Sequence, residues 1–505
     1  MTYTLGIDIG TYESKGALVC VSTGKIVAQA AHPHEMLVPQ PGWAEHRPEE
    51  DWWGDAVRII RQLIAESGID PNDIAALAVS AIGPCMLPVD ADGSPLMNGV
   101  LYGVDTRAEK EIAYLNARIG EDEILATCGN ALTSQSVGPK ILWLKRNRPD
   151  LHARTHKMLT STSFITHRLT GECVIDHYTA ANFSPLYDVN RLGWSDALTD
   201  EIVPLDRLPK LCWSCEIAGF VTAWAAGETG LAKGTPVTCG TIDAAAEAVS
   251  VGVCNPGDMM MMYGSTVFVI QVTDDPVRDP RLWYAPWLVP GQHASMAGLA
   301  TSGTLTHWFR DQFAGDLGRE EAFSRLASEA AESPPCSNGL IVLPYFSGER
   351  TPIHDPKAKG VFFGLNLTHA RGDIYRALIE GIAMGTAHVI EAYRDAGAKP
   401  ERILAVGGGT RNSLWLQSTS DFGDVSQTVS RISVGASYGD AFLAALAVGQ
   451  AQWEDIAAWN PPVEKVNPRR LAMHDRHYRR FLRLYEKTKD IAAELSEDLE
   501  AADQQ

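Results

Sequence analysis

The amino terminus of the chain has the residue types and spacing of a small anion site. Apolar and polar residues alternate over 5–10, and the apolar run resumes at 17–19, which predicts a strand, a tight polar turn and a second strand. Gly10 lets the backbone bend close to a ligand, where a Cβ atom would clash. The turn amides and three polar side chains are expected to face one volume and to cradle nucleotide phosphates: Thr11, Ser14 and Lys15.

Asp8 lies on the first of these strands, just before the turn. A carboxylate at that place can bind a magnesium ion directly or through water. An ordinary β-hairpin with a charged tip would show the same pattern. The motif therefore indicates a phosphate and magnesium site without excluding a plain hairpin.

A second candidate centre is the segment 239–246. A short apolar strand is expected over 235–240, and Asp243 stands directly before a helix of small residues at 244–251. An aspartate there can cap the helix through its free amides. It can also point into a cleft and accept a proton from a substrate hydroxyl. Both interpretations stay open on this feature alone.

Glycine-bearing turns recur in the second half of the chain. The turn at 263–266 offers hydroxyls and amides to a phosphate, or is a plain hairpin, and Gly303 permits close approach of a nucleotide. Residues 407–409 are three consecutive glycines between a strand and a helix that starts near Asn412. Because three glycines destabilise any regular element, we expect either a ligand such as adenosine on this backbone or a long left-handed turn.

The loop at 102–107 brings an acid and a base together. Asp105 can hydrogen-bond sugar hydroxyls, and Arg107 can orient its carboxylate. A surface salt bridge between the two is the alternative interpretation.

Strands that alternate with helices must position these residues. In the first half we expect an amphipathic helix over 52–66, a strand over 74–79 and a helix opening at 140–145. A second unit is expected to start near Val253 with a pair of strands over 259–272. Its further elements are strands at 339–343 and 402–406 and helices at 374–392, 437–447 and 474–499. This order predicts mixed α/β sheets in two similar halves with a cleft between them.

The amino-acid composition narrows the classes of molecule that the protein can bind. The 505 residues carry a formal net charge of -19, a surface that repels nucleic acid and anionic membranes. A phosphorylated ligand would therefore need local basic groups, amides or a metal. We expect neither a signal peptide nor a transmembrane helix, and the nine thinly spread cysteines are typical of reduced thiols in the cytoplasm.

Taken together, the motifs resemble the FGGY family of carbohydrate kinases from Leu5 to about Gly449. Four pieces carry the resemblance most specifically. They are Gly6-Ile7-Asp8-Ile9-Gly10-Thr11, Gly240-Thr241-Ile242-Asp243, the run Pro344 to Pro352 with the segments 360–365 and 376–381 that follow it, and Gly407-Gly408-Gly409 with Asn412. Residues 41–45 and 140–144 match as well.

The resemblance implies an α/β fold of two actin-like, ribonuclease-H-like ATPase domains that close on a cleft. The N-terminal domain over 1–250 would bind the sugar and carry the phosphate loop. The C-terminal domain over 251–505 would bind the nucleotide and end in a helix.

The resemblance also implies ATP and Mg²⁺ as cofactors. Asp243 would be the general base that takes a proton from the attacking hydroxyl, and Asp8 would help to hold magnesium. Asp105 and Arg107 would bind the substrate with Asp243. The positions implied at ATP are Gly10, Thr11, Ser14, Lys15, Gly264, Ser265, Gly303, Gly408, Gly409 and Asn412.

Within the family, the layout is most similar to the xylulose kinases, so we expect transfer of phosphate from ATP to a ketopentose such as D-xylulose. Those kinases usually carry Gln-Met-His-Gly after the strand at 74–79, whereas this chain has Ile82-Gly83-Pro84-Cys85. Other ketoses, polyols and small hydroxylated signalling molecules stay open as substrates. A glycerol kinase is less favoured, because its Gln-Arg-Glu motif is missing before Asp105.

One alternative of another class remains. It is a non-catalytic actin-like module that binds a nucleotide and senses a sugar or assembles with itself, although such a module has no need of a carboxylate at Asp243. A dehydrogenase is disfavoured, because residues 6–10 lack the GxGxxG pattern and lead into a strand. We expect a small sugar or polyol as the binding partner. A second copy of the chain, in a homodimer, is an optional further partner.

Overall fold

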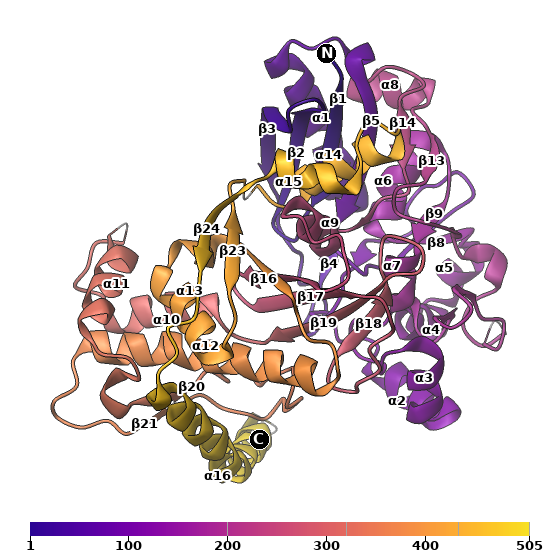
Figure 1. The fold of residues 1–505 in the computed structure, drawn as a ribbon. Helices are drawn as coiled ribbons and strands as arrows, with labels where there is room; N and C mark the ends of the chain where they lie inside the picture. The colour runs from indigo at the N-terminus through magenta and orange to yellow at the C-terminus, as the bar shows by residue number, and fades with distance from the viewer. Residues whose placement is uncertain (199, 320, 433, 504–505) are drawn as a thin grey trace.

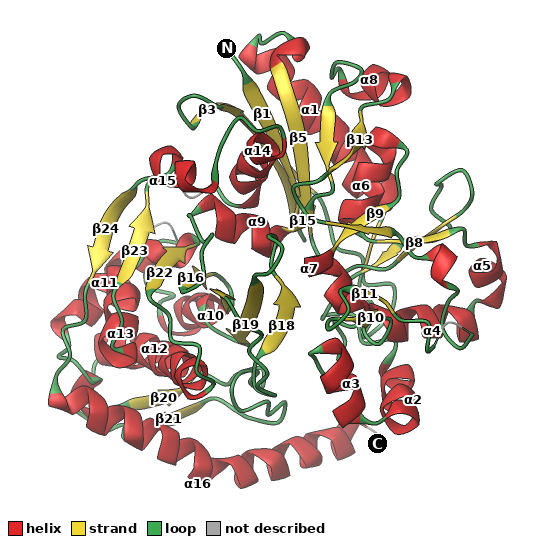
Figure 2. Ribbon diagram, turned by 45° about the vertical axis from the view of Figure 1, so that its right-hand side comes forward, coloured by secondary structure: helices red, strands yellow, loops and turns green. Residues whose placement is uncertain are grey.

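Two seven-stranded sheets organise the protein (Figure 1). The computed structural model describes residues 1–198, 200–319, 321–432 and 434–503. The first sheet has the order β13-β14-β5-β1-β2-β3, with β15 paired to β5, and the second has the order β18-β19-β17-β16-β22-β23-β24. Helices pack against both sheets (Figure 2). The predicted α/β class with two halves is confirmed.

The strands of both sheets are mostly short. Those of the first sheet are β1 Tyr3–Ile9, β2 Glu13–Cys20, β3 Lys25–Pro33, β5 Ile74–Ala81, β13 Ile217–Phe220, β14 Pro236–Thr238 and β15 Thr241–Ile242. Those of the second are β16 Asp258–Tyr263, β17 Val267–Thr273, β18 Trp283–Pro286, β19 His293–Leu299, β22 Arg402–Val406, β23 Gln427–Ser430 and β24 Pro462–Val466. Smaller pairings use β4 Glu45–His46, β6 Leu87–Val89, β7 Gly99–Val100, β8 Lys157–Leu159, β9 Val174–Asp176, β10 Tyr187–Asp188, β11 Gly193–Trp194, β12 Lys210–Cys212, β20 Ile341–Leu343 and β21 Val361–Phe363.

The helices predicted over 52–66, 244–251, 374–392, 437–447 and 474–499 are confirmed, whereas the helix predicted to open at 140–145 already begins at Val137 and several short helices were not predicted. The helices of the first half are α1 Gly54–Ser67, α2 Glu109–Ile119, α3 Glu121–Cys128, α4 Val137–Asn147, α5 Pro149–Arg154, α6 Ser161–Thr170, α7 His177–Ala180, α8 Ala223–Thr229 and α9 Asp243–Ser250. Those of the second half are α10 Gly303–Phe313, α11 Ala322–Glu332, α12 Arg371–Asp395, α13 Ser413–Gly423, α14 Ala436–Ala447, α15 Ile456–Trp459 and α16 Ala472–Asp503. No helix in the described part of the chain is both long enough and apolar enough to cross a lipid bilayer.

The two sheets share the topology of five strands and differ at their edges, where β13 precedes β14 in the chain but β24 follows β23, and where β18 lies between β17 and β19 in sequence. In the first, β1, β2 and β3 form an antiparallel meander, and β5 and then β14 continue the sheet in parallel on the other side of β1. In the second, β16, β17 and β19 form the meander, and β22 and β23 continue it in parallel. The turn between β1 and β2 therefore corresponds to the turn between β16 and β17. The predicted duplication is real at the level of topology.

Helices cover the first sheet on both sides. The side to which a strand residue points therefore decides which groups its side chain can contact. Leu5, Ile7 and Ile9 pack with α1, a side called here the α1 face. Ala17 and Val19 pack with α9 and α14, which cover the opposite side, called here the α14 face. Because successive side chains of a strand alternate between faces, Asp8 and Lys15 belong to the α14 face.

The helix α14 belongs to the second half in sequence but packs on the first sheet, beside the indigo strands in Figure 1. Its approach is very close at two glycines. A Cβ atom on Gly6 of β1 would lie 1.9 Å from the carbonyl oxygen of Ser437, and one on Gly439 would lie 1.8 Å from that of Ala246 in α9. Glycine is required there by space alone. The helix therefore brings its own polar residues to the α14 face.

Candidate functional site

The turn between β1 and β2 is as tight as its sequence predicts. The amide of Gly10 donates to the carbonyl oxygen of Glu13 at 3.1 Å, and a Cβ atom on Gly10 would lie 2.7 Å from that oxygen. Asp8 and Lys15 are opposite each other in the register of the two strands. A carboxylate and an ammonium group thus lie side by side on the α14 face.

The prediction that Ser14 shares a volume with Lys15 is wrong. The Ser14 side chain is fully buried on the α1 face, where its hydroxyl donates to Asp55 Oδ2 at 3.0 Å. Adjacent residues of one strand point to opposite faces, so Ser14 and Lys15 cannot both face a phosphate. Ser14 instead belongs to a polar network behind the turn.

Asp243 is the first residue of α9, directly after β15. Its Oδ1 accepts a hydrogen bond from the amide of Ala244 at 2.7 Å, and its Oδ2 has no partner among the described residues. The N-cap of α9 is Ile242 and no side chain in the described ranges caps this helix, so the capping interpretation of Asp243 is wrong. One oxygen of Asp243 therefore binds the neighbouring amide, and the other is free for a ligand. Burial, with a contribution from the Glu247 carboxylate, raises the pKa of Asp243 to about 7.

Four carboxylates converge on the α14 face. Asp8, Asp243 and Glu247 interact electrostatically, and Asp440 of α14 interacts with Asp8 and Asp243. Burial is the main reason that the pKa of Asp8 and that of Asp440 lie well above the ordinary range for aspartate. Lys15 opposes this effect at Asp8 and Glu247. Such a cluster favours a cation or a proton between its members.

Two oxygens of this cluster fit a divalent cation. Ser80 of β5 donates to Asp440 Oδ2 at 2.6 Å, but Asp440 Oδ1 and Asp8 Oδ1 are buried without a hydrogen-bond partner. Magnesium prefers such hard carboxylate oxygens and usually keeps several waters or phosphate oxygens. No group of three metal-ligating side chains is found in the described ranges. The protein would thus supply few ligands, and a nucleotide the rest.

Asp105 and Arg107 form a buried pair, which corrects both interpretations of this motif. Neither side chain has any exposed surface, and they are linked by a hydrogen bond of 2.7 Å. Asp105 also accepts from the amide of Ala44 at 2.7 Å, and the Arg107 guanidinium lies 3.9 Å from the ring centre of Trp43. The carboxylate is saturated and holds the loop at 43–45 rather than facing a sugar.

The polar group near Asp243 is instead the hydroxyl of Tyr102. Burial raises the pKa of Tyr102 to about 12, with Asp243 adding to this and a hydrogen bond from Thr11 opposing it. The loop at 82–85 packs next to this place with its side chains turned inward: Cys85 is fully buried and its thiol donates to the carbonyl oxygen of Ile82 at 3.3 Å. The hydroxyls of Tyr102 and Thr11 are therefore better placed than this loop to contact a substrate.

The structure brings Gly264, Ser265 and Gly303 together. The amide of Gly303 donates to the carbonyl oxygen of Gly264 at 3.1 Å, and a Cβ atom on Gly303 would lie 2.3 Å from that oxygen. The Ser302 hydroxyl lies 3.2 Å from the carbonyl oxygens of both Gly264 and Ser265. The start of α10 thus locks the turn between β16 and β17.

The three glycines at 407–409 have different reasons to be glycine. Gly407 has a φ of 95°, and a Cβ atom on it would lie 2.7 Å from the carbonyl oxygen of Tyr263. A Cβ atom on Gly409 would lie 2.6 Å from the Trp415 ring. Gly408, in contrast, has no atom within 4 Å of that position. Only Gly408 lacks a packing reason, so the open space beside it can admit a ligand.

Asn412 follows these glycines as the N-cap of α13. Its side chain accepts a hydrogen bond from the amide of Trp415 at 3.2 Å. The expectation of a helix starting near Asn412 is confirmed. The long left-handed turn proposed as the alternative is not found, because only Gly407 has a positive φ and residues 408–411 form a 3₁₀ turn.

Sequence inspection missed three members of the site. Glu247 follows Asp243 by four residues on one helix, a spacing that places both on one side and could have been noticed. Asp440 stands out as a buried acid in an otherwise small and apolar helix. Tyr102 carried no signal, because its place beside Thr11 and Asp243 depends on how distant loops meet.

Comparison with known proteins gives these features a context. Residues 3–250 match the N-terminal domain and residues 259–448 the C-terminal domain of the FGGY family of carbohydrate kinases. The chain is 28% identical to the xylulose kinase of Bacillus subtilis over 452 residues, 89% of each protein. It is 27% identical to glycerol kinase 1 of Streptomyces avermitilis, over 96% of this chain and 97% of that protein. The crystal structure of xylulose kinase from Rhodospirillum rubrum matches with a TM-score of 0.89 at 31% identity, covering 97% of this chain and 99% of that one.

Proposed function

Because the chain belongs to the FGGY family of carbohydrate kinases, we propose that it transfers the terminal phosphoryl group of ATP to a hydroxyl group of a ketopentose such as D-xylulose. The observation that carries this proposal is Asp243, whose pKa of about 7 suits a base that works near neutral pH. Its free Oδ2 would accept the proton of the attacking hydroxyl. A module that only bound a nucleotide would gain nothing from such a group.

The remaining groups would neutralise charge and hold the reactants in line, which is most of what phosphoryl transfer requires. On the first sheet, Lys15 and the turn at Gly10 and Thr11 would meet the β- and γ-phosphates. On the second sheet, the turn at 264–265 and Gly303 would line the phosphate path. Gly408, Gly409 and Asn412 would lie on the adenosine side, with the open space at Gly408 as support.

Asp8 would hold Mg²⁺ with its unpartnered Oδ1, and Asp440 Oδ1 lies in the same cluster. The cation, when bound, neutralises the phosphate charge. Its positive charge would also favour the ionised form of Asp8, whose pKa is raised by burial and, to a smaller extent, by the charge of Asp243. The cluster is therefore better suited to a bound divalent cation than to solvent alone.

The choice of substrate is supported by the relatives and not by the loop at 82–85. Several similar proteins carry the name xylulose kinase, and others the name glycerol kinase. The buried side chains of Ile82 and Cys85 offer a sugar little to bind. Tyr102 and Thr11 would contact it instead, and so small a polar set leaves other ketoses and polyols as the alternative substrates.

A coupled ADP-release assay tests the proposal. Purified protein with MgATP is assayed against pentuloses, hexuloses, pentitols, erythritol and glycerol, with Asp243→Asn in parallel. Turnover on a ketopentose that falls by orders of magnitude in Asp243→Asn, while ATP still binds, is the expected result. Turnover on glycerol alone would show that the substrate is glycerol and not a ketopentose. Equal turnover in the wild type and in Asp243→Asn would refute the role of Asp243.

A further inference from the structure

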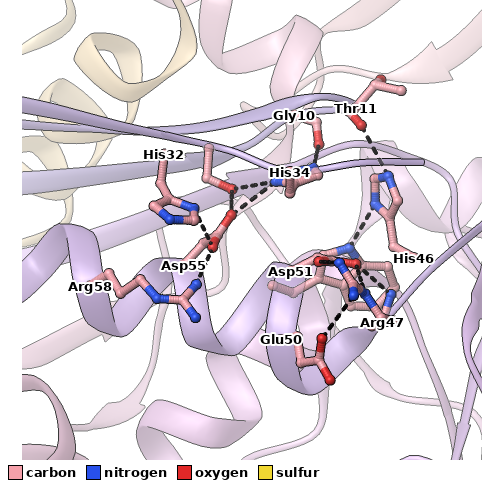
Figure 3. Close-up of polar contacts among 12 residues, drawn as sticks. Gly10, Thr11, His32, His34, His46, Arg47, Glu50, Asp51, Asp55 and Arg58 are labelled. Atoms are coloured by element: carbon pink, nitrogen blue, oxygen red, sulfur yellow. Dashed lines mark hydrogen bonds and ion pairs between the residues drawn. The ribbon is translucent and has the colours of Figure 1, made fainter. Parts of the chain in front are cut away.

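Two histidines approach the phosphate turn from the α1 face (Figure 3). His34 follows β3, and its Nε2 lies 3.1 Å from the carbonyl oxygen of Gly10. His46 ends β4, and its Nε2 lies 3.0 Å from the carbonyl oxygen of Thr11. The two rings touch each other edge to face, with centroids 4.9 Å apart. Consecutive carbonyls of the turn are thus each held by one imidazole.

The partners of each ring fix its protonation. A carbonyl oxygen only accepts, so both Nε2 atoms must carry a proton. His34 Nδ1 lies 2.9 Å from Asp55 Oδ2, a carboxylate oxygen that also only accepts. His34 therefore satisfies both contacts only as the charged imidazolium. His46 is different, because its Nδ1 accepts a hydrogen bond of 3.0 Å from Trp52 Nε1, which requires the neutral ring.

The surrounding charges agree with this assignment. The side chain of Asp55 on α1 is 1% exposed and also pairs with Arg58 at 2.7 Å, while His32 Nδ1 lies 2.9 Å from its Oδ1. Burial, with the charge of His34 as the next cause, lowers the pKa of His46 to about 4. His46 therefore stays neutral near pH 7.

The hydrogen bonds orient the peptide groups of the turn. In a trans peptide the N–H points away from the C=O of the same unit. With the carbonyls of Gly10 and Thr11 drawn toward the α1 face, the amides of Thr11 and Tyr12 must point the other way. Neither amide donates to any acceptor in the part of the chain that the structure describes. They are free donors on the side where Asp8 and Lys15 lie.

We propose that His34 and His46 are positioning residues that hold these two amides toward the phosphates of ATP, an inference that rests on the proposed function of the turn. Neither ring touches the nucleotide. A charged ring holds the first carbonyl and a neutral ring the second. The titratable and charged groups that face His34 are Asp55 and Arg58 of α1, His32 of β3 and His46 of β4.

Calorimetric binding of MgATP, measured without sugar, tests the proposal. His34→Ala and His46→Ala are each expected to weaken binding about tenfold, the effect of one well-placed hydrogen bond. His34→Gln and His46→Gln keep a donor near the Nε2 position and should recover most of the loss. His32→Ala is the matched control, because its ring reaches Asp55 but no carbonyl of the turn. It should bind MgATP like the wild type.

The glutamine variants supply a readout that a merely structural role would not move, because they restore the donor to the carbonyl without restoring the imidazole ring. Weak MgATP binding by folded His34→Gln and His46→Gln overturns the proposal, even if the alanine variants do not fold. Wild-type-like binding by folded His34→Ala and His46→Ala, or an equal loss in His32→Ala, overturns it as well. Failure of the wild type to bind MgATP would refute the proposed function itself.

Discussion

Replacing Glu247 by glutamine is a direct test of Asp243 as the base. Burial and the Glu247 carboxylate together raise the pKa of Asp243 to about 7. Asp243 accepts a proton only when it is ionised, so activity is present above this pKa and is lost as the pH falls through it. In the wild type, kcat/KM is therefore expected to fall about tenfold from pH 8 to pH 6.

The size of the shift follows from the helix geometry. Side chains four residues apart on a helix are about 6 Å apart at their Cβ atoms. With an effective dielectric constant between about 20 and 40, one charge at that distance contributes about 1.4–2.8 kcal/mol, or about 1–2 pKa units. Glu247→Gln should move the acid limb to lower pH by that amount. At pH 6 the variant should keep about five to ten times more of its plateau activity than the wild type.

The measurement is a coupled ADP-release assay from pH 5 to pH 9, with the sugar that gives the highest turnover. Glu228→Gln on the exposed part of α8 is the control, because it removes the same charge outside the carboxylate cluster. Because Asp8, Asp243 and Glu247 interact, the limb belongs to the cluster as a whole. A wild-type profile that stays flat down to pH 5, or an equal shift in Glu228→Gln, would refute the reasoning.

Three further predictions follow from burial and space. Asp243→Asn should be more stable than the wild type by about 4 kcal/mol at pH 8 in thermal unfolding, because a folded-state pKa raised from 3.8 to about 7 penalises the ionised wild type. This gain should vanish below about pH 4, where the aspartate is protonated in the folded and the unfolded state. Gly408→Ala should leave the melting temperature unchanged and raise the KM for ATP, whereas Gly409→Ala, with a Cβ atom 2.6 Å from an indole ring, should lower the melting temperature as well. Arg107→Met leaves the carboxylate of Asp105 buried and unpaired, and should cost about 3–5 kcal/mol in urea unfolding.

The elements of the fold could be predicted because each carries its own periodic signal. The strands at 259–272 and 402–406 and the long helices at 371–395 and 472–503 are apolar runs or amphipathic patterns that local sequence specifies. Short pairings such as β6 with β8 were not predictable, since three residues carry no pattern and the partners lie far apart in sequence. The packing of α14 on the first sheet was also hidden, because it depends on the spatial fit of Gly6 and Gly439.

The site residues were predictable where the backbone conformation requires a particular residue type. They were less predictable where the role depends on which face of the sheet a side chain points to. Gly10 and Asn412 were recognised from turn and cap chemistry, which is local. Ser14 was misplaced because the strand alternation that would have corrected it was not applied to the residues after the turn. Asp105 was misplaced because burial of a charged pair depends on Trp43 and Ala44, which arrive from another loop.

The second half of the molecule supports the proposed role of His34 and His46 behind the turn between β1 and β2. There the carbonyl oxygens of Gly264 and Ser265, in the equivalent turn between β16 and β17, are held by the Ser302 hydroxyl, each at 3.2 Å, and by backbone amides at the start of α10. By the same peptide geometry, the amides of Ser265 and Thr266 must point away from α10. Two turns that share a place in one repeated topology thus have their carbonyls held from behind, and within the described residues neither turn offers an acceptor to its two outward amides. The halves differ in the donor, because two imidazole rings hold the carbonyl oxygens of the first turn, whereas a hydroxyl and backbone amides hold those of the second.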